Sequence, residues 1–194
     1  MSDPSDPVTY NFYGTTVPVL RNVSAAAINT LRTTKDEQSK GSFPCDQEIL
    51  DFKFGDMMPF RMQPVLLAKF SLEALGFLKL TKADVPEMKT DFKTLDEVIE
   101  FFEAVKKVFE NIDEKTYNEA AEKSCDVSIG PGKPTLHVTG LADYIHGFVI
   151  PNSYFHLNAM YMLLRNAGFK LGKGVYIGFF MSEQQQKDWA SLRG

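Results

Sequence analysis

Apolar side chains recur at intervals of three and four residues along most of the chain, and this spacing predicts a protein built mainly of helices. Four long stretches carry the pattern: residues 17–33, 59–80, 94–112 and 141–167. Pro151 interrupts the apolar stripe of the last stretch, so a kink or a short break is expected there. Four amphipathic helices of this length favour a four-helix bundle.

Shorter elements fill the spaces between the long helices. A helical turn is expected within residues 43–54, and a short helix within residues 113–123. Residues 125–129 and 134–138 are short and partly alternating, and the intervening Gly130-Pro131-Gly132-Lys133 is typical of a β-hairpin turn. The sequence therefore predicts one short hairpin just before the last long helix.

Particular residues mark the ends of the helices. Thr94 and Glu97 form the pattern of a capping box at the start of the third long helix. Pro64 must occupy the first turn of its helix or bend that helix, because proline lacks an amide donor. Gly168 is expected to end the last long helix, and Ser182 to cap a short helix that runs through Leu192.

These elements predict an all-α fold, a helix bundle with a short β-hairpin before the last long helix. The expected organisation is an N-terminal arm over residues 1–16, a helical bundle over residues 17–181 and a short C-terminal helix over residues 182–194. Within the bundle, residues 169–181 are glycine-punctuated and are expected to run over the surface or along a groove.

Charge and composition narrow the class of protein. The net charge is −4 and no basic face or arm is visible, so a nucleic-acid partner is not expected. No signal peptide is evident, and no apolar run reaches the roughly 20 residues that span a membrane. The two cysteines, Cys45 and Cys125, are interpreted as unpaired thiols in a reducing compartment, which predicts a cytoplasmic protein. The 16 phenylalanines predict an aromatic-rich core or pocket.

The histidines carry the candidate chemistry. The chain has three, His137, His146 and His156. Ten residues of regular helix would separate His146 and His156 by about 15 Å, so the pair can share a zinc or nickel ion only if the chain folds back near Pro151. His137 lies on a predicted strand beside a turn and is expected to be exposed.

His156 shares a helix face with Ala159 and Leu163, which allows two interpretations. It is either a core histidine with one hydrogen bond or an acid–base or ligand-binding group at a pocket wall. Gln63 lies on the inward line of its own helix, where it is either a clamp between helices or a polar contact to a ligand.

Two segments of the chain resemble the family called domain of unknown function 1993, grouped with the DinB-like four-helix bundles. The first holds Asp56-Met57-Met58-Pro59 and Gln63. The second holds, together with His146, the residues Pro151-Asn152-Ser153-Tyr154-Phe155-His156, Tyr161, Leu164-Arg165, Gly168, Leu171-Gly172-Lys173 and Tyr176-Ile177-Gly178. The resemblance covers roughly residues 17–178.

The resemblance implies an up-down-down-up bundle and, often, a dimer. DinB-like proteins commonly hold a divalent metal with three histidines, and some relatives use it in thiol-dependent transfer or hydrolysis. This chain has Lys69 where related bundles often have Asp or His, and an ammonium group is not a metal ligand. Lys69 is expected to reach solvent along its alkyl chain.

The second segment adds three candidate binding residues. Asn152 follows Pro151 and is expected to pair with carbonyls freed by the kink or to face a pocket. Tyr154 is expected to place its hydroxyl in the pocket. Arg165 either binds a substrate carboxylate or makes a structural ion pair at the end of the helix.

These observations lead to a hypothesis and its rivals. The chain is expected to be an enzyme acting on a small molecule in a pocket between the second and last long helices. His156 would transfer the proton and His146 would orient it, while Gln63, Asn152, Tyr154 and Arg165 would bind substrate. The alternatives are a non-catalytic small-molecule-binding protein, a metal-dependent DinB-like transferase or hydrolase, and a structural dimerisation module.

Overall fold

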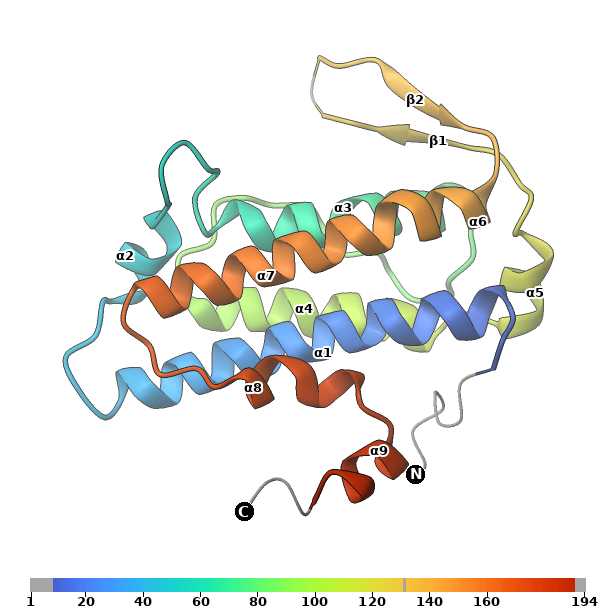
Figure 1. Cartoon of the computed structure of the whole chain (residues 1–194). Coiled ribbons are helices and arrows are strands. Elements are labelled where there is room, and N and C mark those ends of the chain that lie inside the picture. Colours follow the sequence, from blue (N-terminus) through green and yellow to red (C-terminus); the bar gives the residue numbers. More distant parts are fainter. Residues whose placement is uncertain (1–8, 131, 191–194) are drawn as a thin grey trace.

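The computed structural model describes residues 9–130 and 132–190, and helices dominate it (Figure 1). In chain order the helical elements are α1 (Phe12–Gln38), α2 (Asp46–Asp51), α3 (Met62–Phe77), α4 (Leu95–Glu110), α5 (Glu114–Glu119), α6 (Leu141–Tyr144), the π-helical segment η1 (Ile145–Val149), α7 (Ile150–Asn166), α8 (Lys173–Ile177), the 3₁₀ segment η2 (Gly178–Phe180) and α9 (Glu183–Asp188). The strands β1 (Cys125–Ser128) and β2 (Thr135–Val138) pair antiparallel just before α6. The predicted all-α fold with one hairpin is confirmed.

Four long helices build the core. α1 packs against α4 and α7, and α3 packs against α7 and α4. Figure 1 shows α1 and α7 running in one direction and α3 and α4 in the other. The hydrogen bonds between α7 and α3 agree, because Ser153 meets Leu67 whereas His156 meets Gln63. The long helices therefore follow the expected up-down-down-up order.

Local capping signals place several helix ends where the sequence predicts them. The Thr94 hydroxyl accepts a hydrogen bond from the Glu97 amide at 3.2 Å and starts α4. The Glu97 carboxylate accepts from the Lys93 amide at 2.9 Å, one residue earlier than a capping box requires. Pro64 lies in the first turn of α3, where its missing amide costs no helical hydrogen bond. Gly168 ends α7 with φ +99.

α1 is longer at both ends than the sequence predicts. It begins at Phe12, because the Asn11 side chain caps it by accepting from the Gly14 amide at 2.7 Å. Contacts from α5 hold this first turn, since Glu114 binds the Asn11 side chain at 2.9 Å. The prediction of a loose arm was therefore wrong for residues 12–16, and the part over residues 1–8 lies outside the described residues.

The last helical region adapts to its proline without a break. α6, η1 and α7 follow one another directly, and the wider π-helical segment ends two residues before Pro151. A proline ring crowds the carbonyl four residues earlier in an α-helix, and the i→i+5 pattern of η1 relieves this crowding. The predicted interruption is thus a widened turn upstream of Pro151.

The C-terminal segment is more helical than the sequence suggests. Residues 173–180 form α8 and η2, both packed on α1. Ser182 caps α9 as predicted, because its hydroxyl accepts from the Gln185 amide at 3.1 Å. The predicted end of this helix at Leu192 lies outside the described residues. Within residues 9–130 and 132–190, no helix has the length and apolar character needed to cross a membrane.

Candidate functional site

A chain of hydrogen bonds links the start of α3 to the middle of α7. The Gln63 amide nitrogen donates to the Met58 carbonyl at 2.8 Å, and this bond turns the Gln63 side-chain oxygen toward α7. Nδ1 of His156 lies 2.8 Å from that oxygen. The amide of Gln63 is buried, so both of its polar ends are satisfied by this arrangement. The two segments that carried the sequence resemblance therefore meet at this point.

The same series of hydrogen bonds determines which ring nitrogen of His156 carries a hydrogen. A side-chain amide oxygen only accepts, so Nδ1 of His156 carries the hydrogen and Nε2 keeps its lone pair. Burial lowers the pKa of His156 from 6.5 to about 4. The imidazole is therefore neutral at pH 7, and its Nε2 is an acceptor for a hydrogen bond or a proton.

Asn152 and Ser153 fasten α7 to α3 beside His156. The Asn152 side chain donates to the Leu66 carbonyl at 2.9 Å, and the Ser153 hydroxyl donates to the Leu67 carbonyl at 3.0 Å. One prediction was that Asn152 would pair with carbonyls freed by the kink in its own helix. That prediction was wrong, because the side chain binds a carbonyl of α3 instead. Asn152 lies one turn before His156 on the same helix face.

An apolar hollow of about 220 Å³ continues this face of α7. It lies between the loop before α3 and the second half of α7, and its lining residues are Phe54, Met57, Ala159, Met162, Leu163 and Asn166. Ala159 and Leu163 follow His156 at helical spacing, which places the hollow one turn beyond the imidazole. The Phe54 and Met57 contribution was missed from the sequence, although apolar residues in a glycine- and proline-containing loop were the available signal.

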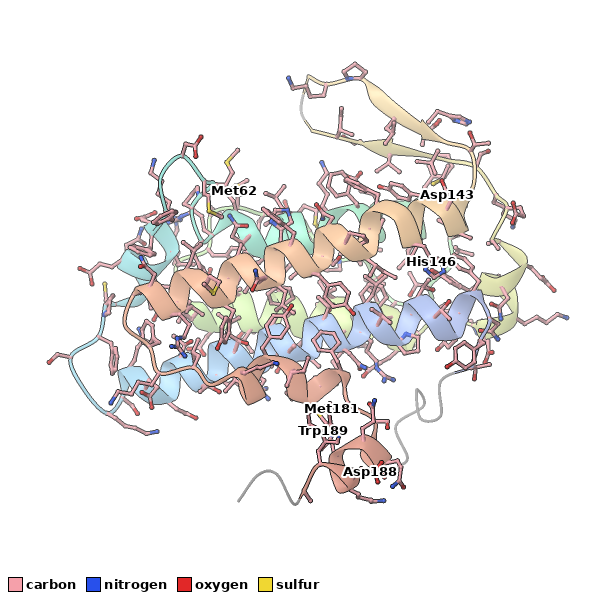
Figure 2. All side chains as sticks on the ribbon, in the orientation of Figure 1. Met62, Asp143, His146, Met181, Asp188 and Trp189 are labelled. Atoms are coloured by element: carbon pink, nitrogen blue, oxygen red, sulfur yellow. The ribbon has the colours of Figure 1, made fainter. Side chains whose placement is uncertain are left out.

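His146 lies elsewhere. Its Nε2 lies 3.4 Å from the Thr15 hydroxyl, and its ring lies 6.1 Å from that of Phe12, both at the start of α1. Figure 2 shows His146 near one end of the bundle and Met62, the neighbour of Gln63, near the other. The prediction that His146 and His156 share a pocket is therefore wrong. The helical rise between them is retained, because η1 does not fold the chain back.

The other two candidate residues also leave the His156 site. Tyr154 is two residues from His156 and so points to the opposite side of α7, where its ring lies 5.5 Å from Phe180. Arg165 donates to the Leu171 carbonyl, which also accepts from the Tyr161 hydroxyl at 2.7 Å. Arg165 thus fixes the turn after α7, and it makes no ion pair with an acid in the part of the chain that the structure describes.

The residues around His156 do not fit a three-histidine metal centre. Among residues 9–130 and 132–190, no three His, Cys, Asp or Glu side chains are grouped so as to hold a metal ion. The neighbours of His156 are the amides Gln63 and Asn152, both already bonded within the protein. Lys69 pairs with Glu73 at 3.5 Å with only 14% of its side chain exposed, so its expected extension into solvent was wrong.

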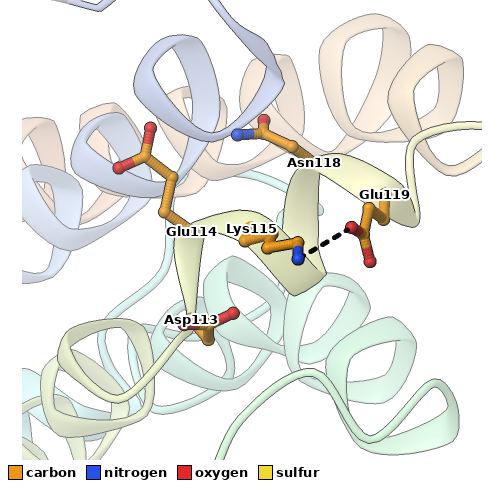
Figure 3. Close-up of a pocket in the computed structure, with 5 residues that line it drawn as sticks. All are labelled: Asp113, Glu114, Lys115, Asn118 and Glu119. Carbon is orange, nitrogen blue, oxygen red and sulfur yellow. Dashed lines mark ion pairs between the residues drawn. The ribbon is translucent and has the colours of Figure 1, made fainter.

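The remaining histidine and a second hollow carry no comparable chemistry. His137 is exposed, as predicted, and pairs with Asp126 across the hairpin at 2.8 Å. A broad, open hollow of about 700 Å³ lies over α5 and is lined by Asp113, Glu114, Lys115, Asn118 and Glu119 (Figure 3). Glu114 and Asn118 already bind the start of α1, and Lys115 lies 3.9 Å from Glu119.

Comparison with known proteins places this geometry in a family. The family model described as "Domain of unknown function (DUF1993)" matches residues 12–177. A solved structure of a DinB family member protein from Shewanella denitrificans is similar over 86% of this chain and 91% of that chain, with a TM-score of 0.66 and 22% sequence identity. No curated protein sequence matches the chain. The structural likeness shows that the all-α fold is DinB-like.

Proposed function

This chain belongs to the DUF1993 family, and we propose that it is a small-molecule-binding protein. Its polar contact would be Nε2 of His156, which has no hydrogen-bond partner among residues 9–130 and 132–190. The observation that carries this proposal is the pair of hydrogen bonds through which Gln63 connects the Met58 carbonyl to His156. It holds a neutral imidazole with one lone pair available. The ligand would be a small apolar molecule with one O–H or N–H donor, since the adjoining hollow is lined almost entirely by apolar side chains.

Phenol is a suitable probe, because it combines an apolar ring with a single O–H donor. With ¹⁵N-labelled histidine, phenol is expected to shift the Nε2 resonance of His156 while Nδ1 stays protonated. His137 and His146 serve as internal controls, since His137 pairs with Asp126 on the hairpin and His146 lies against the start of α1, whereas His156 lies one turn from the hollow. Toluene, which lacks the donor, should leave Nε2 unchanged. A phenol effect that is equal at all three histidines would refute the proposed site.

Catalysis by proton transfer is a second candidate, favoured by the orientation of His156. A base held by a hydrogen bond from its other ring nitrogen has the arrangement of general bases in enzymes. With a pKa of about 4, His156 would accept protons only from acidic groups. His156→Gln would then abolish turnover and leave the helical circular dichroism unchanged, whereas ligand binding without any product would support the binding protein.

A homodimer formed through α7 is part of the proposal. Phe148 of η1 and Phe155 and Met162 of α7 recur at seven-residue spacing and are 43%, 61% and 56% exposed, and Phe54 and Met58 extend the patch. At about 200 Å² for each whole side chain, the exposed parts amount to roughly 1,100 Å² across two copies, close to the lower limit for a specific interface. Phe54 and Met162 also line the apolar hollow, so a second copy would close it.

Sedimentation equilibrium tests the dimer. Phe155→Glu is expected to convert a dimer into a monomer, because it places a charge at the centre of the patch. Phe179→Glu is the matched control, since Phe179 is 42% exposed but lies on η2, outside the patch. A wild-type protein that remains monomeric at high micromolar concentration would contradict this part of the proposal.

We also propose a cytoplasmic location. Both cysteines are unpaired, with Cys45 exposed and Cys125 buried. Unpaired thiols of this kind are typical of reducing compartments, where an accessible Cys45 would stay reduced.

A further inference from the structure

A separate groove of about 310 Å³ lies between α1 and the C-terminal segment. One face of α1 forms one side of it, and Tyr154 with the segment from η2 to α9 forms the other. The lining residues are Gly14, Thr15, Pro18, Val19, Asn22, Tyr154, Phe180, Met181, Ser182 and Gln185. Figure 2 shows Met181 on this side of the bundle, together with Asp188 at the end of α9 and Trp189 just after it.

This groove is independent of the His156 site. Tyr154 and His156 are two residues apart on α7, and side chains at this spacing lie on nearly opposite faces of a helix. Tyr154 accordingly contacts Phe180, whereas His156 contacts Gln63 on α3. The groove can therefore be occupied, blocked or altered without touching the chemistry of the imidazole.

The chemistry of the lining is neutral and rich in donors. None of the residues that line the groove is Asp, Glu, Lys or Arg. Tyr154 is half-buried, and its hydroxyl has no hydrogen bond among the residues that the structure describes. The side-chain oxygen of Asn22 accepts a hydrogen bond from Arg21, and that of Gln185 accepts one from the Ser182 amide. The NH₂ groups of both side chains therefore remain as donors. Among the residues that the structure describes, these three donors have no acceptor, and all three border one groove.

The walls are apolar and partly aromatic. Tyr154, Phe180 and Tyr176 form a series of rings with centroids 5.5 and 5.9 Å apart. Pro18 and Val19 of α1 lie across the groove from this series. A flat apolar body fits between such walls, and the donors require acceptor oxygens on its edge.

We propose that this groove is a second binding site, which takes a flat, uncharged aromatic compound carrying carbonyl oxygens. The lack of a charged lining residue favours a neutral carbonyl over a carboxylate or phosphate, which would need a cation to replace its hydration. The Tyr154 hydroxyl and the two amide NH₂ groups would donate to the carbonyl oxygens.

Coumarin is a suitable probe, because it is flat, uncharged and carries a lactone carbonyl. Trp189 is the single tryptophan of the chain and lies one turn after Gln185, so its fluorescence reports on the groove. Saturable quenching of Trp189 by coumarin is expected. Tyr154→Phe removes one neutral hydrogen bond and should weaken binding roughly three- to tenfold.

Three further variants make the test decisive. Val19→Phe blocks the groove without adding a second tryptophan, and it should abolish saturable quenching of Trp189. Tyr161→Phe is the matched control, because its hydroxyl donates to the Leu171 carbonyl and does not line the groove, so binding should persist. His156→Phe should also leave coumarin binding unchanged, which separates this site from the proposed function. Linear quenching without saturation, or quenching unaffected by both Tyr154→Phe and Val19→Phe, would overturn the proposal.

Discussion

The Nδ1 atom of His156 lies 2.8 Å from the side-chain oxygen of Gln63, and this contact joins the middle of α7 to the start of α3. Both residues are parts of longer networks. Gln63 is held by the Met58 carbonyl, and α7 is held to α3 by Asn152 and Ser153. The imidazole is consequently positioned from two directions, and the orientation of its second nitrogen is set before any ligand arrives.

Replacing Gln63 with leucine should destabilise the protein by about 1–3 kcal/mol, because the half-buried Nδ1–H of His156 and the Met58 carbonyl both lose their partner. Urea unfolding followed by circular dichroism measures the change. Gln47→Leu is the control, since Gln47 is exposed and its side chain donates to Asp51 within the same helix. Equal effects of the two substitutions would show that Gln63 is not a clamp.

Stability should fall as the pH is lowered from about 6.5 to about 4. The folded pKa of His156 is about 4, below its ordinary value of 6.5, because burial disfavours the charged ring. Between these values the unfolded chain binds more protons, so its protonation favours unfolding. Because the His156 ring is partly exposed to solvent, we expect the free energy of unfolding to fall by on the order of 1–2 kcal/mol.

Denaturant unfolding at pH 7 and pH 4.5 tests this prediction. The difference in unfolding free energy between the two pH values should be smaller in His156→Phe than in the wild type by this amount. His137→Phe is the control, because His137 is exposed. An unchanged pH difference in His156→Phe would mean that the ring titrates normally.

Tyr144→Phe should leave the protein as stable as the wild type or stabilise it by up to about 1 kcal/mol. The Tyr144 side chain is only 7% exposed, and its hydroxyl has no hydrogen-bond partner in the described part of the chain. Removing an unsatisfied buried hydroxyl removes a desolvation cost.

Tyr117→Phe supplies the matched comparison. The Tyr117 hydroxyl is also buried but lies 3.2 Å from the Thr16 hydroxyl, so its removal should destabilise the protein by about 1 kcal/mol. Thermal melts of the two variants compare their stabilities with that of the wild type. A larger loss for Tyr144→Phe than for Tyr117→Phe would show that Tyr144 has a partner in solution.

The two thiols should react at very different rates. Cys45 is exposed, whereas Cys125 is 1% exposed and burial raises the pKa of its thiol. Because the thiolate is the reactive species, Ellman's reagent should modify one thiol quickly and the second only after unfolding. Cys45→Ser should remove the fast phase, and a fast phase that persists in this variant would contradict the burial of Cys125.

Much of the fold was predictable because its signals are local. The apolar stripe after Thr94, the hairpin turn around Gly130 and the stop at Gly168 each depend on residues within one or two turns of the chain. The separation of His146 from His156 also followed from helical rise alone. The sequence indicated that Gln63 and His156 are each candidate site residues, but it did not predict that their side chains are in contact.

By itself the sequence determined which segments become the four long helices, where most of these end, and that one imidazole and one amide fall on apolar faces. Only the tertiary structure decided that Gln63 meets His156, that Tyr154 turns to a groove on the other side of α7, and that α5 extends α1 to Phe12. The reason is physical. Periodicity and capping act over a few residues, whereas these contacts join positions far apart in the chain, 93 residues for Gln63 and His156 and 103 for Asn11 and Glu114.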